Sequence, residues 1–220
     1  YDMAQLIHKE VMDKGINLIL NETVEKVTED SVVLSSGEEV DAGAVVMAIG
    51  VCPETELAED ADLELGETGS IKVNHNYQTS DDDIYAVGDA IETYHQLTNE
   101  TIRLPLAGPA QRQARAAADH IYGKSHNNNG VIGSSVVQAF DLSAAATGLN
   151  EKQAKEAGIP HDIVYTIPMD KVGLMPDSHP MHFKLVYEDP TGRILGAQAI
   201  GEGNVDKRID VIASMISMDA

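Results

Sequence analysis

The eleven residues from 79 to 89 read Thr-Ser-Asp-Asp-Asp-Ile-Tyr-Ala-Val-Gly-Asp, and they decide the fold prediction. A charged stretch typical of a turn passes directly into four apolar residues, which predict a strand over residues 84–87. That strand ends at Gly88 and Asp89. Ligands of open parallel sheets bind outside the carboxyl ends of the strands, where a carboxylate accepts hydrogen bonds from sugar hydroxyls and glycine lets a ligand approach the backbone. The alternative is that Asp89 only caps a turn or a helix.

Upstream of this stretch, the pattern predicts a helix followed by short strands. Apolar residues recur at helical spacing over residues 2–13, with Asp2 as the expected N-cap and Gly15 as the stop. Strands are predicted at residues 17–20, 23–27, 31–34 and 44–49. The last of these is apolar throughout, so we expect it to be buried on both faces. A first domain, residues 1–52, is predicted to end just after it.

Downstream, the pattern predicts two further domains. Residues 53–130 are acidic at first, with a short strand at 71–73 and then an alanine-rich helix over 106–122, and a loop at 125–130 marks their end. Residues 131–220 alternate strands and helices. The Asp-Pro-Thr-Gly sequence at 189–192 suits the turn of an antiparallel hairpin, which predicts an α+β unit. Strands are predicted at 136–140, 143–147, 161–167, 181–187 and 193–200, and helices at 150–157, capped by Asn150, and at 204–218.

The composition excludes several classes of function. The 220 residues include 15 Lys plus Arg against 36 Asp plus Glu, a net charge of −21, so the chain has little with which to replace the counterions of nucleic acid. No apolar run approaches the roughly 18 residues that span a bilayer, and the first residues do not resemble a signal peptide. We therefore expect a soluble, cytoplasmic protein with no nucleic-acid or membrane partner.

No metal site or catalytic residue is predicted from the side chains alone. Cys52 is the single cysteine, which excludes an internal disulfide and a cysteine-rich zinc site. His179 and His182 lie three apart at the start of a predicted strand, where alternation places them on opposite faces. The acidic clusters at 56–67 and 81–83 lack the spacing of a calcium loop, so we expect them to be solvated surface.

Four motifs, taken in order, resemble those of the pyridine nucleotide-disulfide oxidoreductases, which are flavoproteins with two dinucleotide-binding folds. Residues 79–89 are similar to the second flavin-binding motif of that family. Residues 46–53, Val-Met-Ala-Ile-Gly-Val-Cys-Pro, resemble its crossing from the NAD domain to the FAD domain. Residues 104–112 resemble the helix start beneath the flavin, and residues 192–201 resemble paired strands of the dimerisation domain.

The resemblance implies an α/β and α+β fold. In chain order it consists of the end of a NAD-binding Rossmann-like domain, the C-terminal half of a FAD-binding domain and an α+β dimerisation domain. It also implies FAD and NAD(P)H as cofactors and a homodimer as the assembly. The sequence contains neither of the two Gly-x-Gly-x-x-Gly turns that bind the pyrophosphates. We therefore expect the chain to be the C-terminal part of a longer enzyme and to be inactive alone.

The resemblance further assigns cofactor contacts. In this family the aspartate of the second motif hydrogen-bonds the ribityl chain of FAD, a role implied for Asp89. A helix start beneath the flavin would stabilise negative charge on the reduced ring, while the alanines of the same helix are also explained by close packing. The other implied contacts are Thr79 and Gly88 in the motif, Pro105, Leu106 and Ala107 at the helix start, and Gly50 on the nicotinamide side.

The C-terminal residues are most similar to the single-cysteine branch, which includes coenzyme A-disulfide reductase, NADH oxidase and persulfide reductases. The implied acceptor is a small disulfide, persulfide or related molecule. Gln111 stands where coenzyme A-disulfide reductases have a substrate-side histidine, which makes it a candidate substrate contact. Residues 174–177, Leu-Met-Pro-Asp, lack the tyrosines of that enzyme and argue against coenzyme A disulfide itself. Cys52 lies outside the half that carries the redox cysteine, so we expect it to be passive.

Two other functions remain open at this point. One is an NADH oxidase or peroxidase, which would consume oxygen or peroxide without a disulfide acceptor. The other is a non-catalytic dimerisation module, which would be colourless and would not oxidise NADH.

Overall fold

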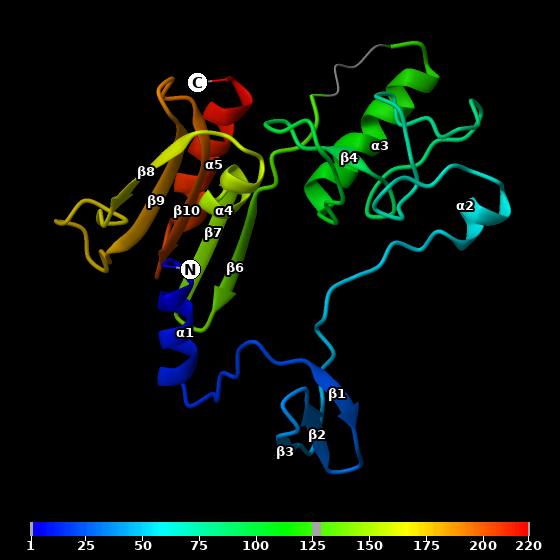
Figure 1. Cartoon of the computed structure of the whole chain (residues 1–220). Helices are drawn as coiled ribbons and strands as arrows, with labels where there is room; N and C mark the ends of the chain where they lie inside the picture. The colour runs from blue at the N-terminus through cyan, green and yellow to red at the C-terminus, as the bar shows by residue number, and fades with distance from the viewer. Residues whose placement is uncertain (1, 125–128, 220) are drawn as a thin grey trace.

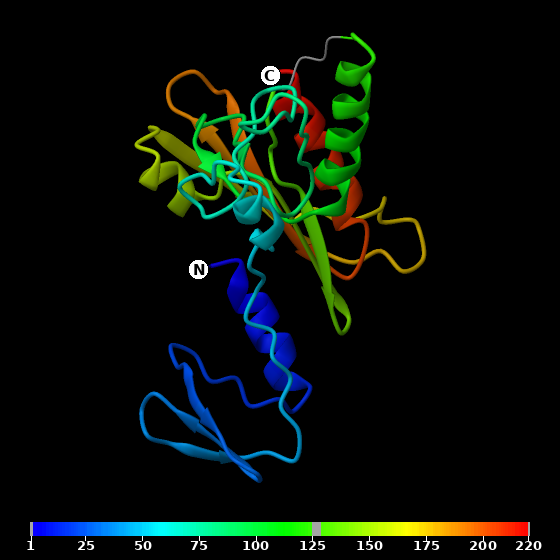
Figure 2. The same cartoon turned by 90° about the vertical axis from the view of Figure 1, so that its right-hand side faces the viewer.

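A computed structural model describes residues 2–124 and 129–219. It shows a mixed α/β and α+β chain with three regions, which we call the N-terminal region (2–52), the middle region (53–124) and the C-terminal region (129–219). In both Figure 1 and Figure 2 the small sheet of the N-terminal region lies apart from the other elements.

The N-terminal region contains one helix and a three-stranded antiparallel sheet of order β1-β2-β3. The predicted helix is confirmed, but its N-cap is Met3 rather than Asp2. Asp2 does not cap because its Oδ1 accepts a hydrogen bond from the adjacent Met3 amide (2.8 Å), which lies outside the first turn. The elements are α1 (Ala4–Asp13), β1 (Val24–Val27), β2 (Ser31–Leu34) and β3 (Glu39–Asp41).

The predicted strands at 17–20 and 44–49 are wrong. Neither segment belongs to a strand, and the side chains of Val46 and Ile49 are 89% and 85% exposed. An apolar run becomes a strand only where a neighbouring strand takes its backbone hydrogen bonds. Among the described residues, the three-stranded sheet does not extend to these segments, so they remain extended and exposed.

The middle region packs loops against one long helix. The predicted helix over 106–122 is confirmed as α3, and its residue Ala117 packs with Val73, Tyr77 and Ile91 in a small core. Figure 1 shows α3 beside the loops that it covers. The elements are α2 (Glu56–Asp60), β4 (Thr93–Tyr94), β5 (Thr101–Ile102) and α3 (Ala107–Ile121).

The predicted strands at 71–73 and 84–87 are also wrong, although single bridges and side-chain contacts hold both segments in place. Ile71 forms single bridges with Leu65 and Ile91, and Tyr85 forms one with Gln78. A single bridge does not make a strand, because a ladder requires successive pairs. The second segment is fixed instead by its side chains, since Tyr85 Oη hydrogen-bonds His120 Nδ1 of α3 (2.7 Å) and Ala86 packs against the small core.

The C-terminal region confirms the predicted α+β unit. Its five strands are all antiparallel in the order β6-β7-β10-β9-β8, and α5 covers one face, where Ala197 and Ala199 are fully buried with Val205 and Ile209. The Asn150 side chain forms the predicted cap as part of a capping box. The elements are β6 (Ser135–Ala139), β7 (Leu142–Gly148), α4 (Glu151–Glu156), β8 (His161–Thr166), β9 (Met181–Glu188), β10 (Ile194–Gly201) and α5 (Val205–Ser217).

The described residues also bear on the remaining expectations. Within 2–124 and 129–219, no helix has both the length and the hydropathy to cross a membrane. In the same residues, no three His, Cys, Asp or Glu side chains gather in a way that could hold a metal ion. His179 Nδ1 lies 3.4 Å from Glu202, whereas His182 Nδ1 bonds Tyr165 Oη at 2.5 Å, so the two histidines have different partners. Residues 125–128 of the predicted loop lie outside the described residues.

Candidate functional site

A cavity of about 980 Å³ lies between the N-terminal and middle regions. Gly50 and Cys52 line it from one side, and Asp89, Arg103 and Pro105 line it from the other. Its volume is at the upper end of the range for cofactor sites, roughly 300–1,000 Å³. The structure therefore brings three of the predicted cofactor contacts, Gly50, Asp89 and Pro105, to one cavity.

The carboxylate of Asp89 is exposed in this cavity. Among the described residues it has no hydrogen-bond or ion-pair partner, so its acceptor oxygens are available to a ligand. The preceding Gly88 has φ +86°, and a Cβ added there would lie 3.8 Å from Ala110 Cβ, an ordinary contact. Glycine is thus favoured by the backbone conformation rather than by lack of space.

Gln113 holds the Gly88 turn from helix α3, and the sequence analysis missed it. Its side chain is only 3% exposed, and Oε1 accepts a hydrogen bond from the Gly88 amide at 2.7 Å. Gln113 lies between Pro109 and Ala117 on the buried face of α3, with a spacing of four residues on each side. A polar residue at that spacing within an otherwise apolar stripe was the available signal.

Thr79 shapes the loop rather than lining the cavity. Its hydroxyl donates to the Asp81 carbonyl oxygen (3.1 Å) and accepts from the Asp81 amide (3.2 Å), and its amide donates to the Ile84 carbonyl oxygen (2.9 Å). These bonds close the charged turn that leads to Gly88 and Asp89. A direct contact between Thr79 and a cofactor stays a prediction.

The segment from Pro105 to Ala107 separates two cavities. Pro105 lines the first, while Leu106 and Ala107 line a second one of about 930 Å³ between α3 and α5. Among the described residues no side chain caps α3, whose N-cap is Leu106, so the amides of Ala107 and Gly108 can meet a ligand at the positive end of the helix dipole. Gln111 is exposed on α3 and lines neither cavity.

Two further residues add chemistry to the first cavity. Arg103 is exposed and forms no ion pair with any described residue, so a permanent positive charge faces the same space as Asp89. The thiol of Cys52 is exposed in the same cavity. Arg103 was not predicted, although an arginine two residues before Pro105 stands out in so acidic a chain.

The residues that line this cavity fit part of a flavin. A carboxylate without an internal partner can accept hydrogen bonds from the hydroxyls of a sugar-alcohol chain. The apolar side chains of Ile49, Val51 and Val87 line the same cavity and suit a flat aromatic ring. Polar groups for hydroxyls and an apolar wall for a ring are therefore both present.

Two family models match the sequence. The model for pyridine nucleotide-disulphide oxidoreductases matches residues 1–114, and the model for the dimerisation domain of the same family matches residues 134–220. Among curated proteins, the NAD(P)H sulfur oxidoreductase (CoA-dependent) of Pyrococcus furiosus is 33% identical over 215 residues, which cover 98% of this chain and 47% of that protein. The coenzyme A disulfide reductase of Staphylococcus epidermidis is 29% identical over 220 residues, or 100% of this chain and 50% of that protein.

A solved structure is also similar to this chain. The crystal structure of reduced Bacillus anthracis CoADR-RHD matches with a TM-score of 0.96 and 41% identity, covering 100% of this chain and 40% of that one. The chain spans about half the length of the curated relatives that it matches. The resemblance inferred from the four motifs is confirmed, as is the fold class. This chain belongs to the pyridine nucleotide-disulphide oxidoreductase family.

Proposed function

We propose that the chain contributes to a FAD-dependent oxidoreductase that passes electrons from NAD(P)H to a small disulfide, persulfide or related acceptor. The observation that supports this best is the cavity that joins Gly50, Asp89 and Pro105. The relatives named sulfur oxidoreductase and coenzyme A disulfide reductase support the class of acceptor. When bound, FAD supplies the two-electron chemistry that links the pyridine nucleotide to the acceptor.

Several of the predicted contacts then have a defined task. Asp89 accepts hydrogen bonds from the ribityl hydroxyls, and the uncapped start of α3 stabilises negative charge on the reduced ring. Gly50 has φ +94°, and a Cβ added to it would meet nothing within 4 Å, so its edge of the cavity is open for the nicotinamide. Gln111 remains the candidate substrate contact from the exposed face of α3.

Other tasks fall to residues outside this chain. The sequence has no Gly-x-Gly-x-x-Gly turn, so we expect the pyrophosphates of both cofactors to be bound elsewhere. The C-terminal region matches the dimerisation domain of the family, which supports a homodimer as the functional assembly. We propose the domain boundaries near residues 52 and 130 on the same basis.

Replacing Asp89 by alanine in the full-length protein tests this function. Hydrogen bonds to a charged acceptor contribute about 1.5–3 kcal/mol, so flavin affinity should fall roughly 10- to 150-fold. The measurement is the ratio of bound flavin to protein, followed by titration of the apoprotein with FAD. Asp82→Ala is the matched control, because Asp82 is exposed in the same loop and its side chain has no partner among the described residues. Unchanged flavin affinity in Asp89→Ala would contradict the proposal.

A further inference from the structure

The loop between β8 and β9, residues 167–180, exposes a cluster of large apolar side chains. Figure 1 and Figure 2 both show this β8–β9 loop extending beyond the five-stranded sheet. The exposed side chains are those of Ile167, Met169, Val172, Leu174 and Met175. Leu174 is 95% exposed and Val172 is 69% exposed. Single apolar residues are normal on a protein surface, but five within one loop are typical of a surface that another molecule covers.

A buried carboxylate fixes the base of the β8–β9 loop. Asp170 lies among these exposed residues, yet it is only 6% exposed itself. Its Oδ1 accepts a hydrogen bond from the His179 amide at 2.8 Å, and its Oδ2 accepts one from the side chain of Asn204, the N-cap of α5, at 2.9 Å. The Asp170 amide also donates to the His179 carbonyl oxygen at 2.9 Å. The two sides of the loop and the start of α5 are therefore joined at Asp170, and the apolar side chains belong to a loop that is already shaped.

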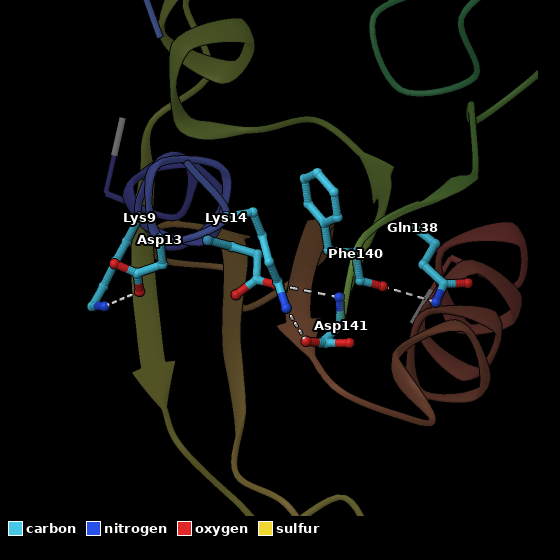
Figure 3. A network of polar contacts seen from close by, with 7 residues as sticks. Lys9, Asp13, Lys14, Gln138, Phe140 and Asp141 are labelled. Carbon is cyan, nitrogen blue, oxygen red and sulfur yellow. Dashed lines mark hydrogen bonds and ion pairs between the residues drawn. The ribbon is translucent and has the colours of Figure 1, made fainter. Parts of the chain in front are cut away.

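The opposite edge of the same sheet is covered from within the chain. The edge strands are β6 and β8, and Figure 3 shows α1 beside the turn that follows β6. Lys14 Nζ of that segment lies 2.5 Å from Asp141 Oδ2 and 5.9 Å from the centre of the Phe140 ring. The aromatic ring at the β6 edge thus has a contact within the chain. The β8–β9 loop, at the other edge, has no such cover from the described residues, as the exposure of Leu174 shows.

A second copy of this chain is the occupant that fits the loop. The family model for the dimerisation domain matches residues 134–220, which include the whole loop. Two copies with a net charge of −21 each repel one another, so their association depends on apolar contact area. Lys171 of the loop donates to the Asp177 carbonyl oxygen (3.0 Å) and forms no ion pair with any described residue. A positive charge beside an apolar cluster suits the acidic surface of a second copy.

We propose that the β8–β9 loop packs its apolar side chains against a second copy of this chain, and that Asp170 is the positioning residue that holds the loop in shape for this contact. The inference deepens the homodimer of the proposed function and rests on it. In a two-fold dimer the loop occurs twice, so each copy makes the same contact. Because Asp170 shapes the loop beforehand, little conformational entropy is lost there on association.

Leu174→Asp in the full-length protein tests the contact. Sedimentation velocity over a dilution series of fluorescently labelled protein measures the dissociation constant of the dimer. This constant should rise at least about 100-fold, because the substitution removes a buried leucine from both copies and adds two charges. Leu57→Asp is the matched control, since it makes the same substitution at an 85% exposed leucine of α2, outside the matched dimerisation domain, and should leave the constant unchanged. Circular dichroism shows whether each variant is folded.

Asp170→Ala tests the positioning role, because it removes both acceptor oxygens. Amide hydrogen exchange in the β8–β9 loop should become at least about tenfold faster, and the dissociation constant of the dimer should rise at least about tenfold, because the loop must then be ordered on association. Asp170→Asn keeps an oxygen for the His179 amide and should restore both values part of the way. If Asp170→Ala does not fold, Asn204→Gly should give the same two changes. It removes the bond from the α5 side, and glycine adopts the φ of +57° at this position freely.

The possible results have distinct meanings. An unchanged dissociation constant in Leu174→Asp would overturn the proposed contact. If that variant instead unfolded at lower urea concentration while its dimer stayed intact, the loop would be covered by another part of the same polypeptide, which also overturns it. Faster exchange with unchanged dimerisation in Asp170→Ala would overturn the positioning role. An unaltered protein that is monomeric throughout the dilution series would contradict the homodimer itself, whereas the flavin measurement with Asp89→Ala tests the rest of the proposed function separately.

Discussion

Replacing Gln113 by leucine tests whether helix α3 sets the loop that carries Asp89. Leucine has a similar volume but no acceptor, so the Gly88 amide loses the partner that now lies 2.7 Å away. A buried donor left without a partner costs about 1–3 kcal/mol. Gly88 is half-buried, so part of that cost is recovered from water, and we expect a loss of about 1–2 kcal/mol in the free energy of unfolding.

The same change should weaken flavin binding. If the loop turns its amide towards water, Asp89 moves with it, and an energy of about 1–2 kcal/mol corresponds to roughly 5- to 30-fold in affinity. Urea unfolding followed by circular dichroism measures stability, and titration of the apoprotein with FAD measures affinity. Gln111→Leu is the matched control, because it makes the same substitution at an exposed position of α3. Unchanged stability and affinity in Gln113→Leu would refute the reasoning.

Three further changes have definite expected outcomes. Gly196→Ala should lower the free energy of unfolding by at least about 2 kcal/mol in urea, because the added Cβ would lie 2.1 Å from the Leu149 carbonyl oxygen; Gly173→Ala, with nothing within 4 Å, should not. Asn150→Ala removes the capping box of α4 and should cost about 1 kcal/mol in the same assay, so equal stability would argue against the cap. Burial lowers the pKa of His95, so its folded form resists protonation and stability falls as the pH decreases through 6.5. The decrease in melting temperature between about pH 7.5 and about pH 5.5 should therefore be smaller in His95→Asn.

The sequence predicted best those elements whose partners are close along the chain. The hairpin of β9 and β10 follows from one turn, the cap of α4 from Asn150, and α3 from its spacing of alanines. Each of these depends on contacts within a few residues or across one turn. Their local signals therefore agree with the final structure.

The errors have a common physical cause. The apolar composition of residues 44–49 and 84–87 favours a buried strand, but it does not say whether another strand lies beside them. The strand predictions therefore failed where the pairing partner was missing or was reduced to a single bridge.

Some residues of the candidate site were predicted from the sequence, and others were not. The convergence of Gly50, Asp89 and Pro105 followed from the order of the motifs, which carries the arrangement of a whole family. Gln113 was not predicted, because the Gly88 amide that it binds lies 25 residues away and only the folded chain brings the two together.

The exposed segment 44–49 also affects how this chain behaves in concentrated solution. It presents six apolar residues, Ala-Val-Val-Met-Ala-Ile, without charge or proline, and its backbone forms no hydrogen bond with any described residue. Such a segment is a template for β-pairing between molecules and can start aggregation. The net charge of −21 makes separate molecules repel one another. Because added salt screens this repulsion, it should promote aggregation that begins at this segment.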